Sequence, residues 1–202
     1  NWDGFPSDWT EIDDAVKINN KVYFFNGSEY LKYDIASHEV DPGYPLPISY
    51  WVGFPSDWTE IDAAVNIDNK VYFFRKNQYL KYDIASQRVD PGYPLPISYW
   101  SGFPSDWTEI DAAVNFGNGK IYFFRKKEYL RYDIASQKVD VIPGFPYPAR
   151  IAVNWKGVPA SWLSLNYHVS DIFVSHQGVC FDSQYVYTID TEKIYKRDLD
   201  LT

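Results

Sequence analysis

Cysteine is almost absent from this chain of 202 residues, and methionine is absent altogether. Because Cys180 is the only cysteine, the chain can form no internal disulfide and has no CxxC pair for a redox or zinc site. No apolar run approaches the roughly 20 residues that a membrane-spanning helix needs, so no membrane span is expected. Basic residues are outnumbered, with 19 Lys and Arg against 27 Asp and Glu and a formal net charge of -8. Phosphate binding needs a basic surface, so nucleic acid is not an expected partner.

The chain is rich in aromatic side chains. Its 8 Trp, 18 Tyr and 13 Phe make up 19% of the residues, and aromatic residues favour the half-buried, pleated surface of β-strands. The 13 prolines and 11 glycines favour many short strands and turns over long helices. The composition therefore predicts an all-β fold.

The sequence repeats itself at an interval of 49 residues. The segment VGFPSDWTEIDAAVN at 52–66 recurs almost unchanged from Asp3 and from Ser101. Residues 3–51 and 52–100 are identical at 39 of 49 positions. Repeats of this length are typical of supersecondary units that bury their faces only by stacking on one another.

Each unit has the pattern of four short strands and a connector. In the second unit we expect strands at 62–66, 70–74, 79–84 and 88–90, followed by a proline-rich break and a helical turn at 97–100. The polar residues between the second and third strands are expected to form a hairpin loop. Four antiparallel strands per unit are typical of a propeller blade.

A fourth, more divergent unit follows. The segment PGFPYP at 143–148 matches PGYPLP at 91–96, with additional residues before Trp155. Its four strands are expected at 171–174, 178–181, 185–190 and 193–198. The blades of a single domain, 1–202, then span approximately 3–51, 52–100, 101–154 and 155–202. Four blades close into a ring, which removes exposed sheet edges.

Five motifs in constant order and spacing resemble the hemopexin repeat. In the second unit they are Asp62-Ala63-Ala64, Tyr72-Phe73-Phe74, Tyr79–Asp83, Gly92-Tyr93-Pro94 and Trp100–Pro104. The resemblance implies a four-bladed, hemopexin-type β-propeller with four antiparallel strands per blade around a central channel. The family includes hemopexin, the C-terminal domains of matrix metalloproteinases, and legume seed albumins and lectins. Animal members usually join the first and last blades by a disulfide, so apolar packing is expected to close this ring instead.

The resemblance also implies a calcium or sodium ion in the channel, held by the main-chain carbonyl of the Asp that opens each first strand. The candidates are Asp13, Asp62, Asp111 and Asp171, with Asn166 as an alternative counterpart in the fourth unit. Carbonyl oxygens that converge on an axis suit a hard cation. In the alternative interpretation, the Asp side chains cap the strand starts and bond to neighbouring amides.

One tryptophan follows the first Gly-x-Pro motif of each unit. These candidate ligand-binding residues are Trp9, Trp58, Trp107 and Trp162. Aromatic faces often hold sugars and other flat ligands, and packing within or between blades is the alternative role. A second set, for which packing is the expected role, is Trp51, Trp100 and Trp155.

The remaining candidates are basic loops and histidines. The loops at 75–78 and 125–128 carry Arg and Lys, and are expected to form either a solvated rim or a docking patch for an acidic partner. His38, His168 and His176 do not recur at the repeat interval. A haem site of the kind that hemopexin builds from histidines is therefore only an alternative.

The sequence carries no nucleophile elbow, zinc-binding helix, P-loop or dinucleotide glycine pattern. Near-identical repeats place the same groups at equivalent sites, whereas an acid–base pair needs two different environments. We therefore expect no enzyme activity.

The predicted function is a non-catalytic, lectin-like propeller that binds carbohydrate, because equivalent sites on repeated blades can bind multivalently. One alternative is a carrier of a polyamine, another small cationic ligand or haem, as in seed albumins. The other is a storage or protein-docking module with no small ligand. A homodimer is compatible with each. The resemblance favours a secreted or storage compartment, although the lone cysteine is also compatible with cytosol.

Overall fold

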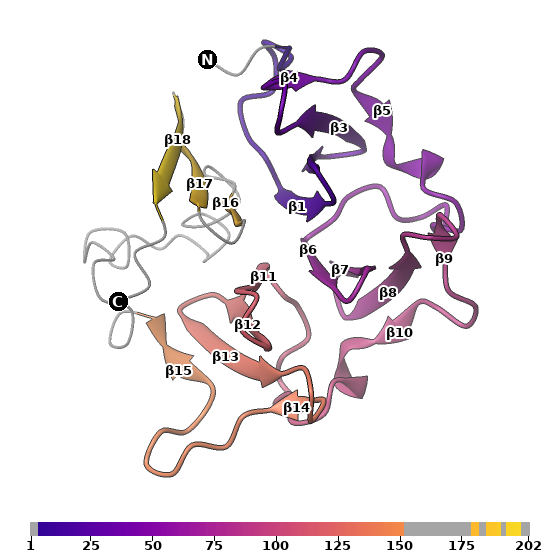
Figure 1. Cartoon of the computed structure of the whole chain (residues 1–202). Coiled ribbons are helices and arrows are strands. Elements are labelled where there is room, and N and C mark those ends of the chain that lie inside the picture. The colour runs from indigo at the N-terminus through magenta and orange to yellow at the C-terminus, as the bar shows by residue number, and fades with distance from the viewer. Residues whose placement is uncertain (1–3, 152–178, 182–184, 191–192, 199–202) are drawn as a thin grey trace.

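The computed structural model describes residues 4–151, 179–181, 185–190 and 193–198. Within these ranges the regular structure is β-strand, apart from two single-turn 3-10 helices. The strands form four antiparallel sheets that surround a common axis as the blades of a propeller (Figure 1). The all-β, four-bladed fold predicted from the sequence is confirmed. None of the described residues forms a helix with the length and apolar character of a bilayer span.

The elements follow one another in the same order in each of the first three blades. Blade 1 contains β1 (Asp14–Ile18), β2 (Lys21–Asn26), β3 (Glu29–Asp34), β4 (Glu39–Val40) and β5 (Leu46–Pro47). Blade 2 contains β6 (Ala63–Ile67), β7 (Lys70–Arg75), β8 (Gln78–Asp83), β9 (Arg88–Val89) and β10 (Leu95–Pro96). Blade 3 contains β11 (Ala112–Asn115), β12 (Lys120–Arg125), β13 (Glu128–Asp133), β14 (Lys138–Val139) and β15 (Ala149–Arg150). Blade 4 contains β16 (Val179–Phe181), β17 (Tyr185–Asp190) and β18 (Lys193–Asp198), and the 3-10 helices are η1 (Ile48–Tyr50) and η2 (Ile97–Tyr99).

The outermost strand of a blade is built from two short pieces. In blade 2, β9 pairs with one end of β8 through Tyr82 and Asp83, and β10 pairs with the other end through Tyr79 and Gln78. The sequence predicted only the first piece, because the proline-rich segment that contains the second reads as a break. Pro96 is tolerated there because an edge position requires no donor on its outer side.

The hairpins between the second and third strands are tighter than expected. Arg75 pairs with Gln78, so the β7–β8 turn consists only of Lys76 and Asn77. The first residue of the turn has a positive φ of 52° in blade 2, and Gly27 in blade 1 has 53°. Two-residue turns with positive φ match the right-handed twist of the flanking strands.

The connector after blade 3 differs from the sequence alignment. The ring of Tyr147 packs against Tyr129 at a centroid distance of 5.7 Å, as Tyr93 packs against Tyr79 at 5.5 Å. The strand that follows, β15, pairs with β13 as β10 pairs with β8. Tyr147, rather than Phe145, is therefore the counterpart of Tyr93, and the extra residues precede it. The repeated proline spacing concealed this shift.

The strand assignment in blade 4 is wrong by one strand. β16 was expected to be the second strand, but it is the innermost one and lies beside β1 and β11 (Figure 1). β17 and β18 are then the second and third strands, and Tyr185 pairs with Asp198 as Lys70 pairs with Asp83. A short β-prone run carries no information about its place in a sheet, which explains the error. The expected strand at 171–174 lies outside the described residues.

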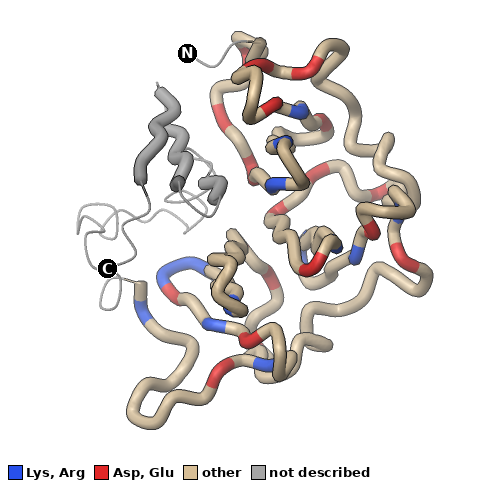
Figure 2. The backbone as a smooth tube through the Cα atoms, in the orientation of Figure 1, with Lys and Arg blue, Asp and Glu red and all other residues tan. Residues whose placement is uncertain are grey.

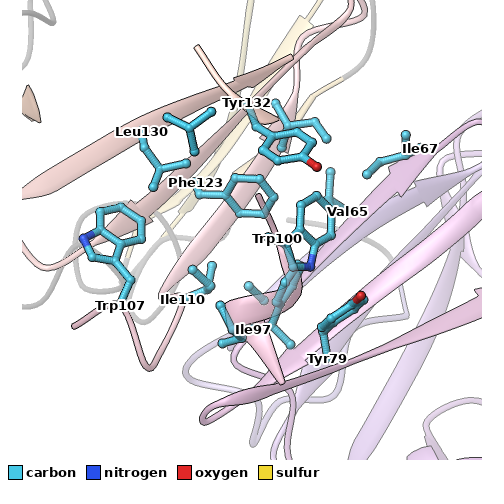
Figure 3. Close-up of a cluster of buried hydrophobic side chains, with 14 residues drawn as sticks. Val65, Ile67, Tyr79, Ile97, Trp100, Trp107, Ile110, Phe123, Leu130 and Tyr132 are labelled. Atoms are coloured by element: carbon cyan, nitrogen blue, oxygen red, sulfur yellow. The ribbon is translucent and has the colours of Figure 1, made fainter. Parts of the chain in front are cut away.

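The core lies mainly at the junctions between blades. The largest buried cluster combines Phe74 and Tyr79 of blade 2 with Phe123 and Tyr132 of blade 3, and Trp100 lies among them (Figure 3). The same arrangement surrounds Trp51 between blades 1 and 2. The packing role predicted for these two tryptophans is confirmed, and Trp155 lies outside the described residues.

Each of the first three blades also has an ion-pair cluster on its outer strands. In blade 1 the Nζ atom of Lys21 lies 2.5 Å from Asp34 and 2.6 Å from Asp41, and Lys32 lies 3.0 Å from Asp41. Blades 2 and 3 repeat the cluster around Lys70 and Lys120. Acidic and basic residues accordingly occur together on all three of these sheets (Figure 2).

Candidate functional site

The innermost strands enclose a central channel. They are β1, β6, β11 and β16 (Figure 1), and the first three line a cavity of about 520 Å³. The wall of the cavity is partly polar, because lysine and asparagine side chains line it beside alanine and valine. The lining from the strands of blades 1 to 3 is Ala15, Val16, Lys17, Ala64, Val65, Asn66, Ala113, Val114 and Asn115.

Side-chain amides connect these inner strands around the axis. The Nδ2 atom of Asn66 donates to the carbonyl of Lys17 at 3.0 Å, and Asn115 donates to the carbonyl of Asn66 at 2.9 Å. Each bond joins one blade to the next. The channel wall is therefore held by hydrogen bonds as well as by packing.

The predicted channel aspartates use their side chains locally. The carboxylate of Asp13 accepts a hydrogen bond from the amide of Gly27 at 2.5 Å. Asp62 accepts from Lys76 at 2.5 Å, and Asp111 accepts from the equivalent turn amide of blade 3 at 2.6 Å. This is the amide bonding described by the alternative interpretation, and it holds the hairpin turn over the start of the inner strand. It leaves the main-chain carbonyls as the predicted ion ligands.

Other carboxylates lie near these aspartates and affect their pKa values. Burial, together with the charges of Glu11, Glu60 and Asp62, raises the pKa of Asp13 to about 6, although the hydrogen bond from the amide of Gly27 acts to lower it. Burial also raises the pKa of Asp62, where the charge of Arg75 acts in the opposite direction. Blade 1 has Asn26 at the position of Arg75, so this offset is missing there.

The donor set fits a hard cation only through main-chain oxygens. Among the described residues, no group of three or more His, Cys, Asp or Glu side chains could hold a metal ion. The inner strands lie at one end of each sheet's strand order, so their channel side has no strand partner to occupy the carbonyls. Carbonyl oxygens are suitable ligands for calcium or sodium. Asp13, Asp62 and Asp111 are therefore still the predicted ligand positions, and Asp171 lies outside the described residues.

The pairing of β16 with β17 also indicates which position of the fourth repeat corresponds to Asp62. Phe181 pairs with Val186 as Asn66 pairs with Val71. Counting back along the sequence, the position that corresponds to Asp62 falls on Gln177.

A further acidic residue that sequence reasoning did not select is buried at the channel. Asp14 is 2% exposed, and one of its carboxyl oxygens accepts a hydrogen bond from the amide of Ala64 in the next blade. Burial raises its pKa well above the ordinary value, while bonds from the amides of Ala15 and Ala64 act to lower it. The aligned repeats have aspartate here and alanine at Ala63 and Ala112, but the sequence does not show that the side chain is buried.

The tryptophans proposed to contact a ligand are mostly inside the protein. Trp58 is 3% exposed and Trp107 is 2% exposed, and each packs edge-to-face against a phenylalanine four residues earlier. Trp9 is half-buried and packs against Phe5. These positions correspond to the packing alternative. Trp162 lies outside the described residues.

The exposed aromatic rings belong to a different pair of residues. Tyr50 is 64% exposed and Tyr99 is 67% exposed, and they occupy equivalent positions at the first two blade junctions. Each lies in a 3-10 turn directly before a buried tryptophan. A signal was present in the repeated ISYW segment, but the sequence does not show which aromatic faces solvent.

Three basic residues of the loops at 75–78 and 125–128 form ion pairs with acidic residues of their own blades. Arg75 lies 3.4 Å from Glu60, Arg125 lies 3.1 Å from Asp106, and Lys126 lies 3.0 Å from Glu109. These contacts favour the solvated-rim interpretation over a docking patch for an acidic partner. His38 is exposed, and His168 and His176 lie outside the described residues.

Comparison with known proteins decides the family. The family model described as Hemopexin matches residues 12–56, 61–105 and 110–160. The chain belongs to the hemopexin family. The three matched segments coincide with blades 1 to 3 and extend past the last strand of the third.

Individual proteins are also similar to this chain. Human neutrophil collagenase is 44% identical over 46 residues, which is 23% of this chain and 10% of that protein. The chain thus matches about a tenth of the length of this relative. Two solved structures from Cicer arietinum are each 16% identical: a plant albumin showing hemagglutination, with TM-score 0.64 over 95% of this chain and 88% of that chain, and a plant lectin with two metal binding sites, with TM-score 0.57 over 94% and 87%. At this identity the likeness shows the fold.

Proposed function

We propose that this protein is a non-catalytic, lectin-like propeller that binds carbohydrate at its rim and holds a calcium or sodium ion in its channel. The observation that carries the proposal is the pair of exposed tyrosines, Tyr50 and Tyr99, at equivalent positions of adjacent blade junctions. They replace Trp58 and its equivalents as the proposed ligand-binding rings.

Each tyrosine is held on a rigid support. Ile48, 2% exposed, anchors the start of η1, and its amide donates to the carbonyl of Ser28 at 2.9 Å. Trp51, 6% exposed, anchors the end, and its amide donates to Ile48 at 3.0 Å. A turn fixed in this way loses little backbone conformational entropy when a ligand stacks on the tyrosine ring. An aromatic face that ends in a hydroxyl suits a sugar ring.

Two equivalent sites support agglutination. A molecule with two separate binding sites can cross-link carbohydrates on different surfaces, and weak single contacts sum through effective concentration. The hemagglutination named for the Cicer arietinum albumin supports this for a protein of the same fold. Counting from Ile151, whose amide donates to Lys127 as that of Ile97 donates to Asn77, the third unit has Val153 in place of the tyrosine, so two tyrosine sites are proposed.

The proposed cation stabilises the ring rather than the sugar site. Carbonyl oxygens of Asp13, Asp62 and Asp111 would hold it where the inner strands converge, and would tie three blades to one ion. The metal sites named for the Cicer arietinum lectin support a metal-holding propeller of this fold. A storage or extracellular location is part of the same proposal.

Hemagglutination combined with glycan-array binding tests the carbohydrate site. We expect the wild type to agglutinate cells, and Tyr50→Ala and Tyr99→Ala each to retain glycan binding but lose agglutination. The double variant should lose both. Val52→Ala changes an exposed apolar residue beside Trp51 and is the matched control that should change neither. Agglutination by the double variant would place the sugar site elsewhere, and failure of the wild type to bind any glycan would refute the lectin proposal.

One observation favours a second candidate, the small cationic ligand. Asp8, Glu11 and Asp13 lie on the blade that lacks the arginine of blades 2 and 3, so the channel mouth is most acidic there. A polyamine would be attracted to such a mouth. Calorimetric titration with spermine separates the two candidates, because Tyr50→Ala should leave polyamine binding unchanged while Asp13→Asn should weaken it.

A further inference from the structure

Each of the first three blades begins with a loop that leads into its innermost strand, and the loop has the same backbone hydrogen bonds in every copy. In blade 2 the amide of Trp58 donates to the carbonyl of Pro55 at 3.0 Å, and the amide of Asp62 donates to that of Phe74 at 2.9 Å. The equivalent distances in blade 1 are 3.2 and 2.8 Å. The loop of blade 1, residues 6–13, is therefore held in the same way as the loop of blade 2.

In blades 2 and 3 an arginine from the neighbouring hairpin packs onto this loop. The side chain of Arg75 is 12% exposed, and its Nη1 and Nη2 atoms lie 3.8 Å from Asp57 and 3.4 Å from Glu60. The side chain of Arg125 is 14% exposed and donates to Asp106 at 3.1 Å. The loop thus holds a guanidinium group in each of these two blades.

Blade 1 has the acidic residues of the loop but not the arginine. Asp8 and Glu11 occupy the acidic positions, and both are exposed. The arginine position is Asn26, which is neutral and too short to reach the place of a guanidinium group, and the lysine position after it is Gly27. Within the described part of the chain, neither Asp8 nor Glu11 forms an ion pair.

The tryptophan of the loop is also more accessible in blade 1. Trp9 is half-buried, whereas Trp58 is 3% exposed and Trp107 is 2% exposed. Trp9 directly follows Asp8 in the chain, so a cation that pairs with this carboxylate can also reach the indole ring. A guanidinium group is planar, stacks on aromatic faces and presents a fork of donors to carboxylates, whereas an ammonium group is a strongly hydrated point charge.

We propose that the loop of blade 1, at Asp8 and Trp9, is a binding site for a guanidinium group of another molecule. This group takes the place that Arg75 and Arg125 take in their own blades, and it belongs to a small molecule or to an arginine side chain of a protein. The inference rests on the second candidate of the proposed function, the cationic ligand, and names the chemical group that is recognised. It requires neither the carbohydrate site nor the channel ion.

NMR titration with butylguanidinium tests the inference, with the indole N–H resonances of the ¹⁵N-labelled protein as the readout. We expect the Trp9 resonance of the wild type to shift and saturate, and the Trp58 resonance to stay in place. Butylammonium has the same chain and charge without the planar fork, and should bind about threefold more weakly. Asn26→Arg should abolish the shift of Trp9, because the protein's own guanidinium group then fills the site as it does in blade 2.

The reverse exchange in blade 2 gives an independent result. Arg75→Asn gives blade 2 the composition of blade 1 at this position, so butylguanidinium should then shift Trp58 as well as Trp9. Arg88→Asn is the matched control, because it removes an exposed arginine from β9 of the same blade, and it should add no second site. Blade 1 accepts asparagine at the exchanged position, so circular dichroism should show an unchanged fold.

A capped pentapeptide with one arginine between glycines distinguishes the two sources of the group. Binding of the peptide as tightly as butylguanidinium assigns the site to an arginine side chain of a protein, and binding of butylguanidinium alone assigns it to a small molecule. An unchanged Trp9 resonance in the wild type, or a shift that persists in Asn26→Arg, would overturn the inference. If spermine still binds in calorimetry, the cationic-ligand candidate survives that result, and if spermine does not bind either, both are refuted.

Discussion

The ring of Trp51 lies 4.7 Å from the ring of Tyr82, centroid to centroid, with an interplanar angle of 68°. Trp51 ends the connector of blade 1 and Tyr82 belongs to β8 of blade 2, so this edge-to-face contact joins two blades. Trp100 and Tyr132 repeat it at 4.9 Å and 66°. The junctions are thus built from equivalent aromatic contacts, each of which contributes about 0.5–1.5 kcal/mol beyond the area buried.

Removal of a junction tryptophan should destabilise the whole ring. We expect Trp51→Ala to lower the free energy of unfolding by about 3–5 kcal/mol, because it leaves a large cavity between blades. Urea unfolding followed by circular dichroism measures the change. Tyr50→Ala, one residue earlier and exposed, should change stability by only about 0.5 kcal/mol. A loss below about 1 kcal/mol for Trp51→Ala would mean that the junction does not depend on this ring.

Two glycines with the same φ allow the cost of backbone strain to be measured separately from the cost of steric crowding. Gly53 and Gly92 both have a φ of 91°, but a Cβ atom at Gly53 would lie 3.0 Å from the Cβ of Val89, whereas nothing lies within 4 Å of one at Gly92. We expect Gly92→Ala to cost about 1 kcal/mol for the backbone angle, and Gly53→Ala about 2–4 kcal/mol because overpacking adds to it. Equal losses in thermal unfolding would show that Val89 moves aside freely.

In the repeated part of the chain, the sequence was sufficient to predict the fold. The 49-residue interval and the alternation around Tyr72 and Tyr82 predicted the number of blades and most strand positions, because these patterns reflect the two faces of a strand. The order of strands in blade 4 did not follow, since Val179–Phe181 carries no mark of its place in the sheet. Pairing depends on contacts between distant residues, which local pattern does not contain.

The outer ion-pair clusters should respond to acid. Hydrogen bonding to Lys70 lowers the pKa of Asp83 from 3.8 to about 2, and Asp34 has the same shift through Lys21. As the pH falls below about 4, the unfolded chain takes up protons at these positions before the folded protein does. The stability that they contribute is therefore complete above pH 4 and is lost between about pH 4 and 2. Urea unfolding across this range measures the loss.

Lysine removal tests the origin of that shift. In Lys70→Ala the pKa of Asp83 should move towards 3.8, and remain below it because the amide of Ser86 still donates to the carboxylate at 2.7 Å. Carboxyl-carbon NMR titration reports this directly. Lys76→Ala, a change in the exposed hairpin turn, is the control and should leave Asp83 at about 2. A pKa that stays at about 2 in Lys70→Ala would assign the shift to the amide alone.

The predicted carbonyl ligation makes side-chain replacement at Asp62 a sharp test. Asp62→Asn keeps an oxygen that can accept from Lys76 and leaves the main-chain carbonyl unchanged. We expect calcium affinity to change by less than about threefold, since the main-chain carbonyl that is proposed to bind the ion is retained. Complete loss of the ion in calorimetry would instead identify the carboxylate as the ligand.

The candidate site was less predictable than the fold. Trp58 recurs in each of the first three blades and Tyr50 recurs at the first two junctions, and burial alone distinguishes a packing ring from an accessible one. Asp14 illustrates the same limit, because its departure from alanine is visible in the repeats whereas its amide partner, Ala64, comes from the next blade. A sequence repeat therefore shows where copies differ, and the three-dimensional contacts show why.

The equivalence of the junctions has a consequence for assembly of the ring. Blades 1 and 2 present nearly the same aromatic surface at Trp51 and at Trp100, so the apolar contacts alone do not specify which blade follows which. A blade from a second molecule would fit either junction, which makes exchange of blades between chains the characteristic error during refolding. The carboxyl group of Asp14 and the longer connector before Tyr147 make individual blades different from one another, and so favour one order of blades in the ring.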